Sequence, residues 1–428
     1  MTKLKQNVIT LLRPGGRYDS RFFVNSILAD QSAKRFRVVK EDDGTPFIYP
    51  VSFSPLAGKD RDDRTFEYFG DAPPSVLEAL RNGRGLFVID HSNEGMEPKN
   101  HTLKLLHDRF SALGIPTERV LLLTQNMRFE DGYNEWIHRQ GDSAPKQFQV
   151  AIYHCFLRQL ATYAEKDLGP AGELSRRVVD YNASIDSGAS RPKRYLCLNF
   201  TPRGHRLATM LHIMQHGLES MGHISFPGLA NRKMSVAGRT EHLLKRQPFP
   251  DIELLQQLLP TLEAQPALQL DTDPFVRVSP VIDVGEWWYY AESWFSLVTE
   301  SGVNGRGHER FTEKPFKAIL GLHPFLIIGL PRTLKLMREY GFQTFAPFID
   351  ETYDSIEDDK LRIALVLAEF RRLCALTDDD WALLTKKIQH IVLHNFNQFM
   401  GPLQKYFLET VEDPLLDRMA LLAAPRNT

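Results

Sequence analysis

Residues 194–206 read RYLCLNFTPRGHR, and the order of residue types in this stretch indicates the fold class. Residues 194–199 form a short apolar run, which is typical of a buried strand. A polar turn with Pro202 and Gly204 follows, and residues 205–220 then predict a helix. Strand, turn and helix in this order predict an α/β fold.

The same alternation of apolar runs and helical periodicity recurs along the chain. Continuous apolar strands between helices indicate a parallel sheet that is covered on both faces. The other predicted strands are residues 85–90, 120–124, 295–299 and 325–328. The other predicted helices are residues 74–82, 99–113, 313–321, 363–375 and 381–407.

A segment rich in glycine, proline and polar residues divides this pattern in two. We interpret residues 168–192 as a loop or a domain junction. The predicted fold is therefore two Rossmann-like α/β domains that face a cleft, followed by a helical C-terminal tail. The expected bounds are 1–185, 190–350 and 351–428. Ligands of open α/β sheets bind beyond the carboxyl ends of the strands, so candidate residues are sought there.

Composition narrows the class of protein. The chain has 428 residues, with 52 basic and 53 acidic side chains and no dominant basic stripe, which disfavours a dedicated duplex-DNA binder. Its three scattered cysteines favour a reducing compartment over a disulfide framework or a zinc site. The N-terminus lacks a signal-peptide core, and the most apolar stretch, 318–334, is interrupted by polar residues and prolines. We therefore expect a cytoplasmic protein without a transmembrane segment.

Cationic side chains follow the strand 194–199. Asn199 ends the strand, and Arg203 and Arg206 lie at the start of the predicted helix. Backbone N–H groups at a helix N-terminus attract anions, and arginine can bind phosphate through two hydrogen bonds. These residues predict a diphosphate site, and the alternative is that both arginines are solvated or paired with surface acids.

A second polar set flanks the strand 295–299. Glu300 follows the strand, and Thr312 is a suitable N-cap for the next helix. Glu313 and Lys314 then lie at the helix N-terminus, where a lysine suits a phosphate and a glutamate suits a sugar or ribose hydroxyl pair. Alternatively, Glu313 stabilises the helix dipole and Lys314 is solvated.

Carboxylates also follow a strand in the N-terminal half. Asp90 ends the strand 85–90 and Glu94 lies just beyond it, so either could accept a proton from an acceptor hydroxyl. The alternative role for each is a loop acid or a helix cap. Asn126 ends the next strand and is expected to line the same cleft.

Three further stretches are assigned no catalytic role. The triplet Asp271-Thr272-Asp273 resembles a metal-binding motif, but such triplets arise often by chance, and we expect no metal. The aromatic stretch 286–290 is interpreted as core rather than as a sugar-stacking platform. The acidic turn 350–354 is expected to cap a helix or to order the cleft.

The second polar set resembles the donor-binding signature of the alpha-1,3-fucosyltransferase family. That signature has an acid at a strand end, a Thr-Glu-Lys triplet before a helix, and a proline before an apolar strand that ends in glycine. The matching residues are Phe295, Ser296, Leu297, Glu300, Ser301, Thr312, Glu313, Lys314, Ala318, Gly321, Pro324 and Gly329. The segment with Asn199 and Arg206 is similar to the family's Asn-Cys…Arg stretch, so the resemblance covers residues 195–330.

The resemblance implies an inverting GT-B glycosyltransferase without a tightly bound cofactor. Its donor would be a nucleotide-diphosphate sugar, with a GDP sugar such as GDP-fucose as the first expectation, and its acceptor a hydroxyl of a glycan or another molecule. Residues 1–185 would form the acceptor-side domain and 190–350 the domain that binds the nucleotide sugar.

The resemblance also assigns roles to single residues. Arg206 and Lys314 would contact the diphosphate, Glu313 the ribose, and Glu300 the sugar or its neighbours. The base would be a carboxylate of the N-terminal domain, which is Glu94 or Asp90.

Some features depart from the family. No asparagine stands between Glu300 and Ser301, His323 precedes Pro324, and the extension 330–354 is unlike the family. The donor sugar is therefore left open.

Two other functions remain open. A basic stretch, 231–246, could serve the glycosylation of modified nucleic-acid bases, although the near-neutral net charge argues mildly against nucleic acid. The chain could also be a non-catalytic nucleotide-binding or assembly protein, because a fold alone does not establish an activity. The sequence does not define the oligomeric state.

Overall fold

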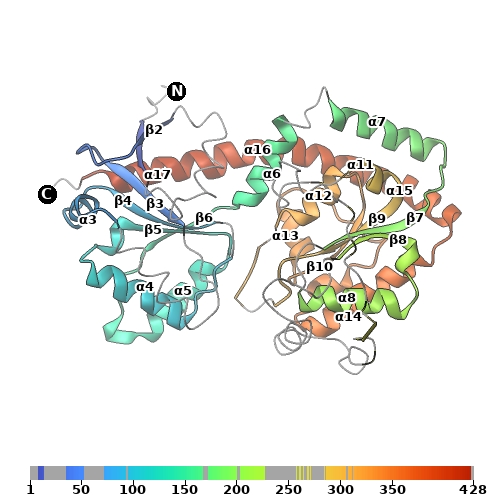
Figure 1. Cartoon of the computed structure of the whole chain (residues 1–428), viewed down its shortest axis with the longest axis horizontal. Coiled ribbons are helices and arrows are strands. Elements are labelled where there is room, and N and C mark those ends of the chain that lie inside the picture. Colours follow the sequence, from blue (N-terminus) through green and yellow to red (C-terminus); the bar gives the residue numbers. More distant parts are fainter. Residues whose placement is uncertain are drawn as a thin grey trace. The chain divides into compact units, whose positions relative to one another are not determined.

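The computed structural model describes residues 8–13, 35–52, 72–92, 95–166, 172–199, 203–226, 286–304, 307–310 and 312–425, with single residues between 257 and 284. The chain forms two units, each around its own sheet (Figure 1). Unit 1 comprises Met1–Thr162, Arg306–Arg310 and Gln404–Thr428. Unit 2 comprises Tyr163–Gly305 and Phe311–Leu403.

The described strands of unit 1 form a six-stranded parallel sheet in the order β2-β1-β3-β4-β5-β6. They are β1 (Ile9–Leu12), β2 (Phe36–Val39), β3 (Phe47–Ser52), β4 (Leu86–His91), β5 (Val120–Thr124) and β6 (Gln149–Ile152). The winding direction reverses between β1 and β3, so this pair is the topological switch point of the sheet.

Helices cover both faces of this sheet, because its central strands are apolar on both sides. Phe87 and Ile89 of β4 pack in one core with α3, α4 and α5, whereas Leu86 and Val88 pack in another with α17. In the described part of unit 1, the longer helices are α3 (Pro74–Arg81), α4 (Asn100–Ala112), α5 (Phe129–Arg139), α6 (Cys155–Lys166), which runs on into unit 2, the π-helix η7 (Phe407–Glu412) and α17 (Asp413–Ala423).

The described strands of unit 2 form a four-stranded parallel sheet in the order β10-β9-β7-β8. They are β7 (Lys193–Leu198), β8 (Gly222–Ser225), β9 (Ser293–Thr299) and β10 (Phe325–Ile328). The chain first winds outward from β7 to β8 and then returns to β9 on the other side of β7. The switch point of this sheet therefore lies between β7 and β9.

Helices also cover both faces of the second sheet. The ring of Tyr195 meets Phe370 of α14 at a centroid distance of 4.8 Å, while the next residue, Leu196, packs with Tyr289 and Tyr290 of α11. In Figure 1, α8 and α14 accordingly lie on one side of this sheet and α11 on the other. Among the described residues of unit 2, the α-helices with defined bounds are α7 (Glu173–Asp186), α8 (Gly204–Gln215), α11 (Trp287–Ala291), α12 (Lys314–Leu320), α13 (Thr333–Glu339), α14 (Asp359–Cys374), α15 (Asp378–Met400) and α16 (Pro402–Tyr406), which continues into unit 1.

The predicted α/β fold class, the parallel sheets and the helical tail are confirmed, and the predicted strands match the observed ones within one or two residues. The prediction that 168–192 is a loop is wrong, because α7 occupies most of it. Leu174, Tyr181 and Ile185 form the buried face of α7, and the glycines and prolines flank the helix rather than interrupt it. The predicted helix 381–407 is interrupted at Gly401, where α15 ends and α16 begins.

All three cysteines of the chain are buried. Among the residues that the structure describes, no helix combines the length and the apolar character that crossing a bilayer requires.

Candidate functional site

The predicted diphosphate residues of unit 2 meet at the switch point of its sheet. β7 and β9 are parallel neighbours, and Asn199 and Thr299 stand at their carboxyl ends. The Thr299 hydroxyl donates a hydrogen bond of 2.6 Å to the Asn199 side-chain oxygen, which links the two strand ends. In open α/β sheets this position is where ligands bind.

Arg206 is fixed to the end of β9. It lies in the first turn of α8, and only 3% of its surface is exposed. Its guanidinium donates hydrogen bonds to the backbone oxygens of Thr299, at 3.1 Å, and Glu300, at 3.2 Å. Burial, and then the nearby charge of Arg203, lower the pKa of Arg206 to about 10, so it remains a cation at neutral pH.

Glu300 organises the loop that follows β9. One carboxylate oxygen accepts hydrogen bonds from the Ser301 amide, at 3.0 Å, and from the Thr312 hydroxyl, at 2.6 Å. The other oxygen accepts from the Thr312 amide at 3.3 Å. Glu300 and Thr312 are both buried, so this pair ties the end of β9 to the start of α12.

Lys314 extends from the first turn of α12 and keeps 24% of its side chain exposed. Its ammonium group donates to the Ser301 hydroxyl at 3.0 Å, to the Thr312 hydroxyl at 3.3 Å and to the carboxylate of buried Glu313 at 2.8 Å. The ammonium is thus placed by three neighbours and is still partly open to solvent.

His205 contributes a neutral ring to the same cluster. Its Nε2 donates to the Glu300 backbone oxygen at 2.7 Å. Burial, followed by the charge of Arg206, lowers the pKa of His205 to about 3, and Arg203 and Lys314 act in the same direction. The formal charges of the cluster are therefore the three cations Arg203, Arg206 and Lys314 against the two carboxylates Glu300 and Glu313.

The N-terminal candidate Asp90 lies at the carboxyl end of β4 in unit 1 and is fully buried. One of its carboxylate oxygens accepts hydrogen bonds from the Ser92 amide, at 3.0 Å, and the Ser92 hydroxyl, at 2.6 Å. In this structure that oxygen orders the start of the loop after β4. Glu94 lies outside the described residues, as do the basic stretch 231–246 and the triplet 271–273.

Asn126 is engaged by a distant segment that belongs to the same unit. Its amide nitrogen donates to the backbone oxygens of Met96, at 2.9 Å, and Gly307, at 2.7 Å. Its side-chain oxygen accepts from the Glu309 amide at 3.0 Å. The backbone of residues 307–309, which the sequence places between β9 and α12, is thus held at the end of β5.

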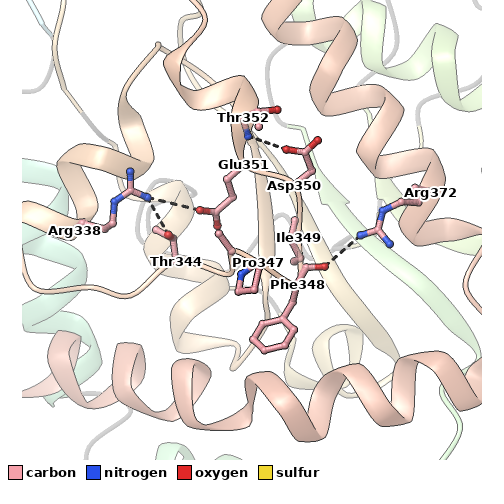
Figure 2. A pocket seen from close by; sticks show the side chains of 10 residues that line it. Arg338, Thr344, Pro347, Phe348, Ile349, Asp350, Glu351, Thr352 and Arg372 are labelled. Carbon is pink, nitrogen blue, oxygen red and sulfur yellow. Dashed lines mark hydrogen bonds and ion pairs between the residues drawn. The ribbon is translucent and has the colours of Figure 1, made fainter.

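A separate hollow of about 840 Å³ lies in unit 2, around the acidic turn 350–354. Figure 2 shows Arg338 and Arg372 on opposite sides of it, with Glu351 between them. Arg338 donates to Thr344 at 2.9 Å and approaches Glu351 at 3.6 Å, and Arg372 pairs with Glu369 at 2.6 Å. Arg338 and Arg372 thus each have an acidic partner, and none of the predicted site residues lines the hollow.

The acidic turn also caps a helix, as expected. The Asp354 carboxylate accepts hydrogen bonds from the amides of Leu334, at 2.8 Å, and Lys335, at 2.9 Å, in the first turn of α13. In the aromatic stretch 286–290, Tyr289 and Tyr290 are core residues, whereas Trp288 is 46% exposed.

Some residues of the cluster were not predicted from the sequence. Ser301 was noted only as part of the family pattern, and its hydroxyl proves to hold Lys314. Arg362 of α14 was missed, although it binds the loop after β9, because no local motif marks it. His323, which departs from the family pattern, has a structural role: its ring bonds Ser296 at 3.0 Å and the Tyr290 backbone oxygen at 2.6 Å.

Comparisons with known proteins add little to this geometry. No protein-family model matches the chain. No curated protein sequence matches it either. The chain is similar to a solved structure described as "Trehalose-6-phosphate from E. coli bound with UDP-2-fluoro glucose", with 11% identity and a TM-score of 0.41, over 94% of this chain and 78% of that one. A likeness this distant does not decide the function, so the functional argument rests on the residues of the site.

Proposed function

We propose that the chain is a glycosyltransferase that moves a sugar from a nucleotide-diphosphate donor to an acceptor hydroxyl. The observation that carries this proposal is the convergence of Arg203, Arg206 and Lys314 at the switch point of a parallel sheet. Two of these cations are wholly or partly buried and fixed by hydrogen bonds, which distinguishes them from solvated surface charges.

In sugar transfer from such a donor, the site must stabilise the departing diphosphate. When the bond from the anomeric carbon to the phosphate oxygen breaks, negative charge grows on the diphosphate, and preorganised cations stabilise it most in a poorly hydrated site. In this proposal Arg206 and Lys314 stabilise that negative charge. Arg206 is already held against β9 and Lys314 against Ser301, so little reorganisation is needed.

The two glutamates take different roles in the proposal. Both oxygens of Glu300 are engaged by its own loop, which favours a part in shaping the site. Glu313 accepts a hydrogen bond from Lys314 through one oxygen, and we assign it to a hydroxyl pair of the nucleotide ribose.

The acceptor hydroxyl must lose a proton, and we assign this step to Glu94 or Asp90 of unit 1. One Asp90 oxygen already accepts hydrogen bonds from the Ser92 amide and hydroxyl, so Glu94 is our first choice as the base. The acceptor oxygen, once its proton passes to the base, would attack the anomeric carbon opposite the leaving diphosphate, which gives inversion.

The donor sugar is proposed as a hexose or deoxyhexose. Fucose is proposed because residues 195–330 resemble the alpha-1,3-fucosyltransferase family. The acceptor is proposed as a hydroxyl of a glycan or of another molecule.

The test is a donor panel that includes GDP-fucose and UDP-glucose. We would measure nucleoside diphosphate release and the shift in melting temperature for the wild-type chain and for Lys314→Ala. We expect one donor to bind and to be hydrolysed slowly, and the variant to lose both effects. Binding of a nucleoside diphosphate without turnover of any donor, even with acceptors present, would instead favour a non-catalytic nucleotide-binding protein.

A further inference from the structure

Arg362 of α14 is buried and binds several backbone segments at once. Its side chain is 2% exposed, although arginine is seldom fully buried without partners. Its guanidinium donates to the backbone oxygens of Gly329 (3.0 Å), Ile356 (2.7 Å), Glu357 (3.3 Å) and Val303, and to the carboxylate of Asp359 (2.5 Å).

Two of these acceptors lie in segments connected to Glu300. Val303 follows Glu300 in the loop after β9, and Gly329 directly follows β10, which pairs with β9. Gly329 also packs against Glu300, because a Cβ atom at position 329 would lie 3.0 Å from the Glu300 Cγ. Arg362 therefore binds both the loop that carries Glu300 and the backbone of Gly329, which packs against the Glu300 side chain.

Glu300 is linked to Lys314 through two shared hydrogen-bond partners. The Glu300 carboxylate binds the Ser301 amide and the Thr312 hydroxyl, and these same two residues receive hydrogen bonds from the Lys314 ammonium group. A shift of the loop that carries Glu300 and Ser301 would therefore move the partners that aim Lys314.

We propose that Arg362 is a positioning residue for the diphosphate site, acting on Lys314 through the loop after β9. The inference rests on the proposed function, in which Lys314 contacts the diphosphate. Arginine suits the role because its planar guanidinium carries five N–H donors, whereas a lysine has three donors on one nitrogen and cannot reach carbonyl groups in several directions.

The same unit offers a matched control. Arg191 is also buried, at 7% exposure, and it donates to the backbone oxygen of Ser293 at 2.6 Å. Ser293 is the first residue of β9, so Arg191 holds the opposite end of the strand from the diphosphate site. Arg362→Lys and Arg191→Lys are therefore the same chemical change at the two ends of one strand.

The experiment is a calorimetric titration of the full chain with GDP and, separately, with UDP, the nucleoside diphosphates of the two donors named in the panel. We expect Arg362→Lys to weaken binding about tenfold, which corresponds to about 1.4 kcal/mol, and Arg191→Lys to change it less than twofold. Equal binding by Arg362→Lys and wild type would overturn the inference.

A double-mutant cycle separates positioning from a general structural role. If Arg362 acts through Lys314, Arg362→Lys should weaken binding little further once Lys314→Ala is present. Additive losses would show that Arg362 does not act through Lys314, which contradicts the inference.

If Arg362→Lys does not fold, two glycine substitutions test the same link between Glu300 and diphosphate binding. Gly329→Ala presses a methyl group against Glu300, whereas Gly302→Ala, in the loop that carries Glu300, meets no atom within 4 Å. We expect only Gly329→Ala to weaken diphosphate binding, and equal binding by the two variants would count against the inference.

A readout without ligand keeps the inference apart from the proposed function. The amide resonances of Ser301 and Thr312, whose N–H groups donate to Glu300, should shift in Arg362→Lys and Gly329→Ala and stay in place in Arg191→Lys. If the wild-type chain binds no nucleoside diphosphate, the proposed function fails, and unchanged amide resonances would separately refute the part that Arg362 plays.

Discussion

The two sheets of this chain have the same winding order, yet their carboxyl ends carry different chemistry. In unit 2 the groups beyond β7 and β9 are mainly cationic, and Lys314 remains partly open to solvent. In unit 1 the groups beyond β4 and β5 include Asp90 and Asn126, which are fully buried and bonded to nearby backbone. The same fold thus presents a cationic cluster in one unit and a carboxylate with an amide in the other.

The difference shows that the fold sets where a site lies and the loops set what it binds. The loop after β9 supplies Glu300, Ser301 and Thr312, which place the Lys314 ammonium. The part of that loop at residues 307–309 instead belongs to unit 1, where Asn126 holds it.

The largest effect is expected at the acceptor side. Glu94→Gln should lower transfer by roughly 100- to 10,000-fold, the usual contribution of a general base, while donor binding changes little. Steady-state rates and donor titrations would check this, with Asp90→Asn made in parallel. Full activity in Glu94→Gln together with a large loss in Asp90→Asn would move the role of base to Asp90.

The second-largest effect is expected for the cations at the carboxyl ends of β7 and β9 in unit 2. Lys314→Ala should weaken nucleoside diphosphate binding by roughly 10- to 100-fold, since a hydrogen bond to a charged group contributes about 1.5–3 kcal/mol. Arg206→Ala should weaken binding at least as much and should also lower the melting temperature, because Arg206 is buried against β9. Lys335→Ala, on the exposed side of α13, is the control, and titration calorimetry is the measurement.

Acid should destabilise both units through buried neutral histidines. Burial lowers the pKa of His323 in unit 2 to about 3 and of His107 in unit 1 to about 4, against about 6.5 in the unfolded chain. Below pH 6.5 the unfolded chain therefore binds protons that the folded chain does not. Stability is fully present above pH 6.5 and falls with decreasing pH, at up to about 1.4 kcal/mol per pH unit for each such histidine.

Thermal unfolding between pH 7 and pH 4 checks this expectation. His323→Gln should flatten the dependence of the melting temperature on pH, and the exposed His101→Gln should not. An unchanged slope in His323→Gln would contradict the assigned protonation state.

The smallest effect is expected at the hollow around residues 350–354. Arg372→Ala removes a half-exposed cation whose partner is the buried Glu369, so the melting temperature should fall while diphosphate binding stays within about twofold. A large loss of diphosphate affinity in Arg372→Ala would place the site in this hollow instead.

Much of the fold could be predicted from the sequence because its central strands are buried on both faces. Runs such as 120–124 and 325–328 are apolar throughout, and the observed β5 and β10 have these bounds. The composition of 168–192 does not reveal α7, because glycines and prolines flank the helix, whereas its buried face follows from the spacing of Leu174, Tyr181 and Ile185.

The candidate site could be predicted only in part. Asn199, Arg206, Glu300 and Lys314 follow predicted strands or begin predicted helices, so the parallel sheet brings them to one edge. Arg362 could not be found in this way, because it reaches the loop after β9 from a helix that begins far along the chain. Its contacts depend on packing that leaves no short motif.

A crystal structure of the chain with a bound nucleoside diphosphate tests the central claim most directly. We predict that the phosphate oxygens lie within hydrogen-bonding distance of Arg206 and Lys314, at the carboxyl ends of β7 and β9. A diphosphate bound at the carboxyl ends of β4 and β5, or in the hollow between Arg338 and Arg372, would contradict the account.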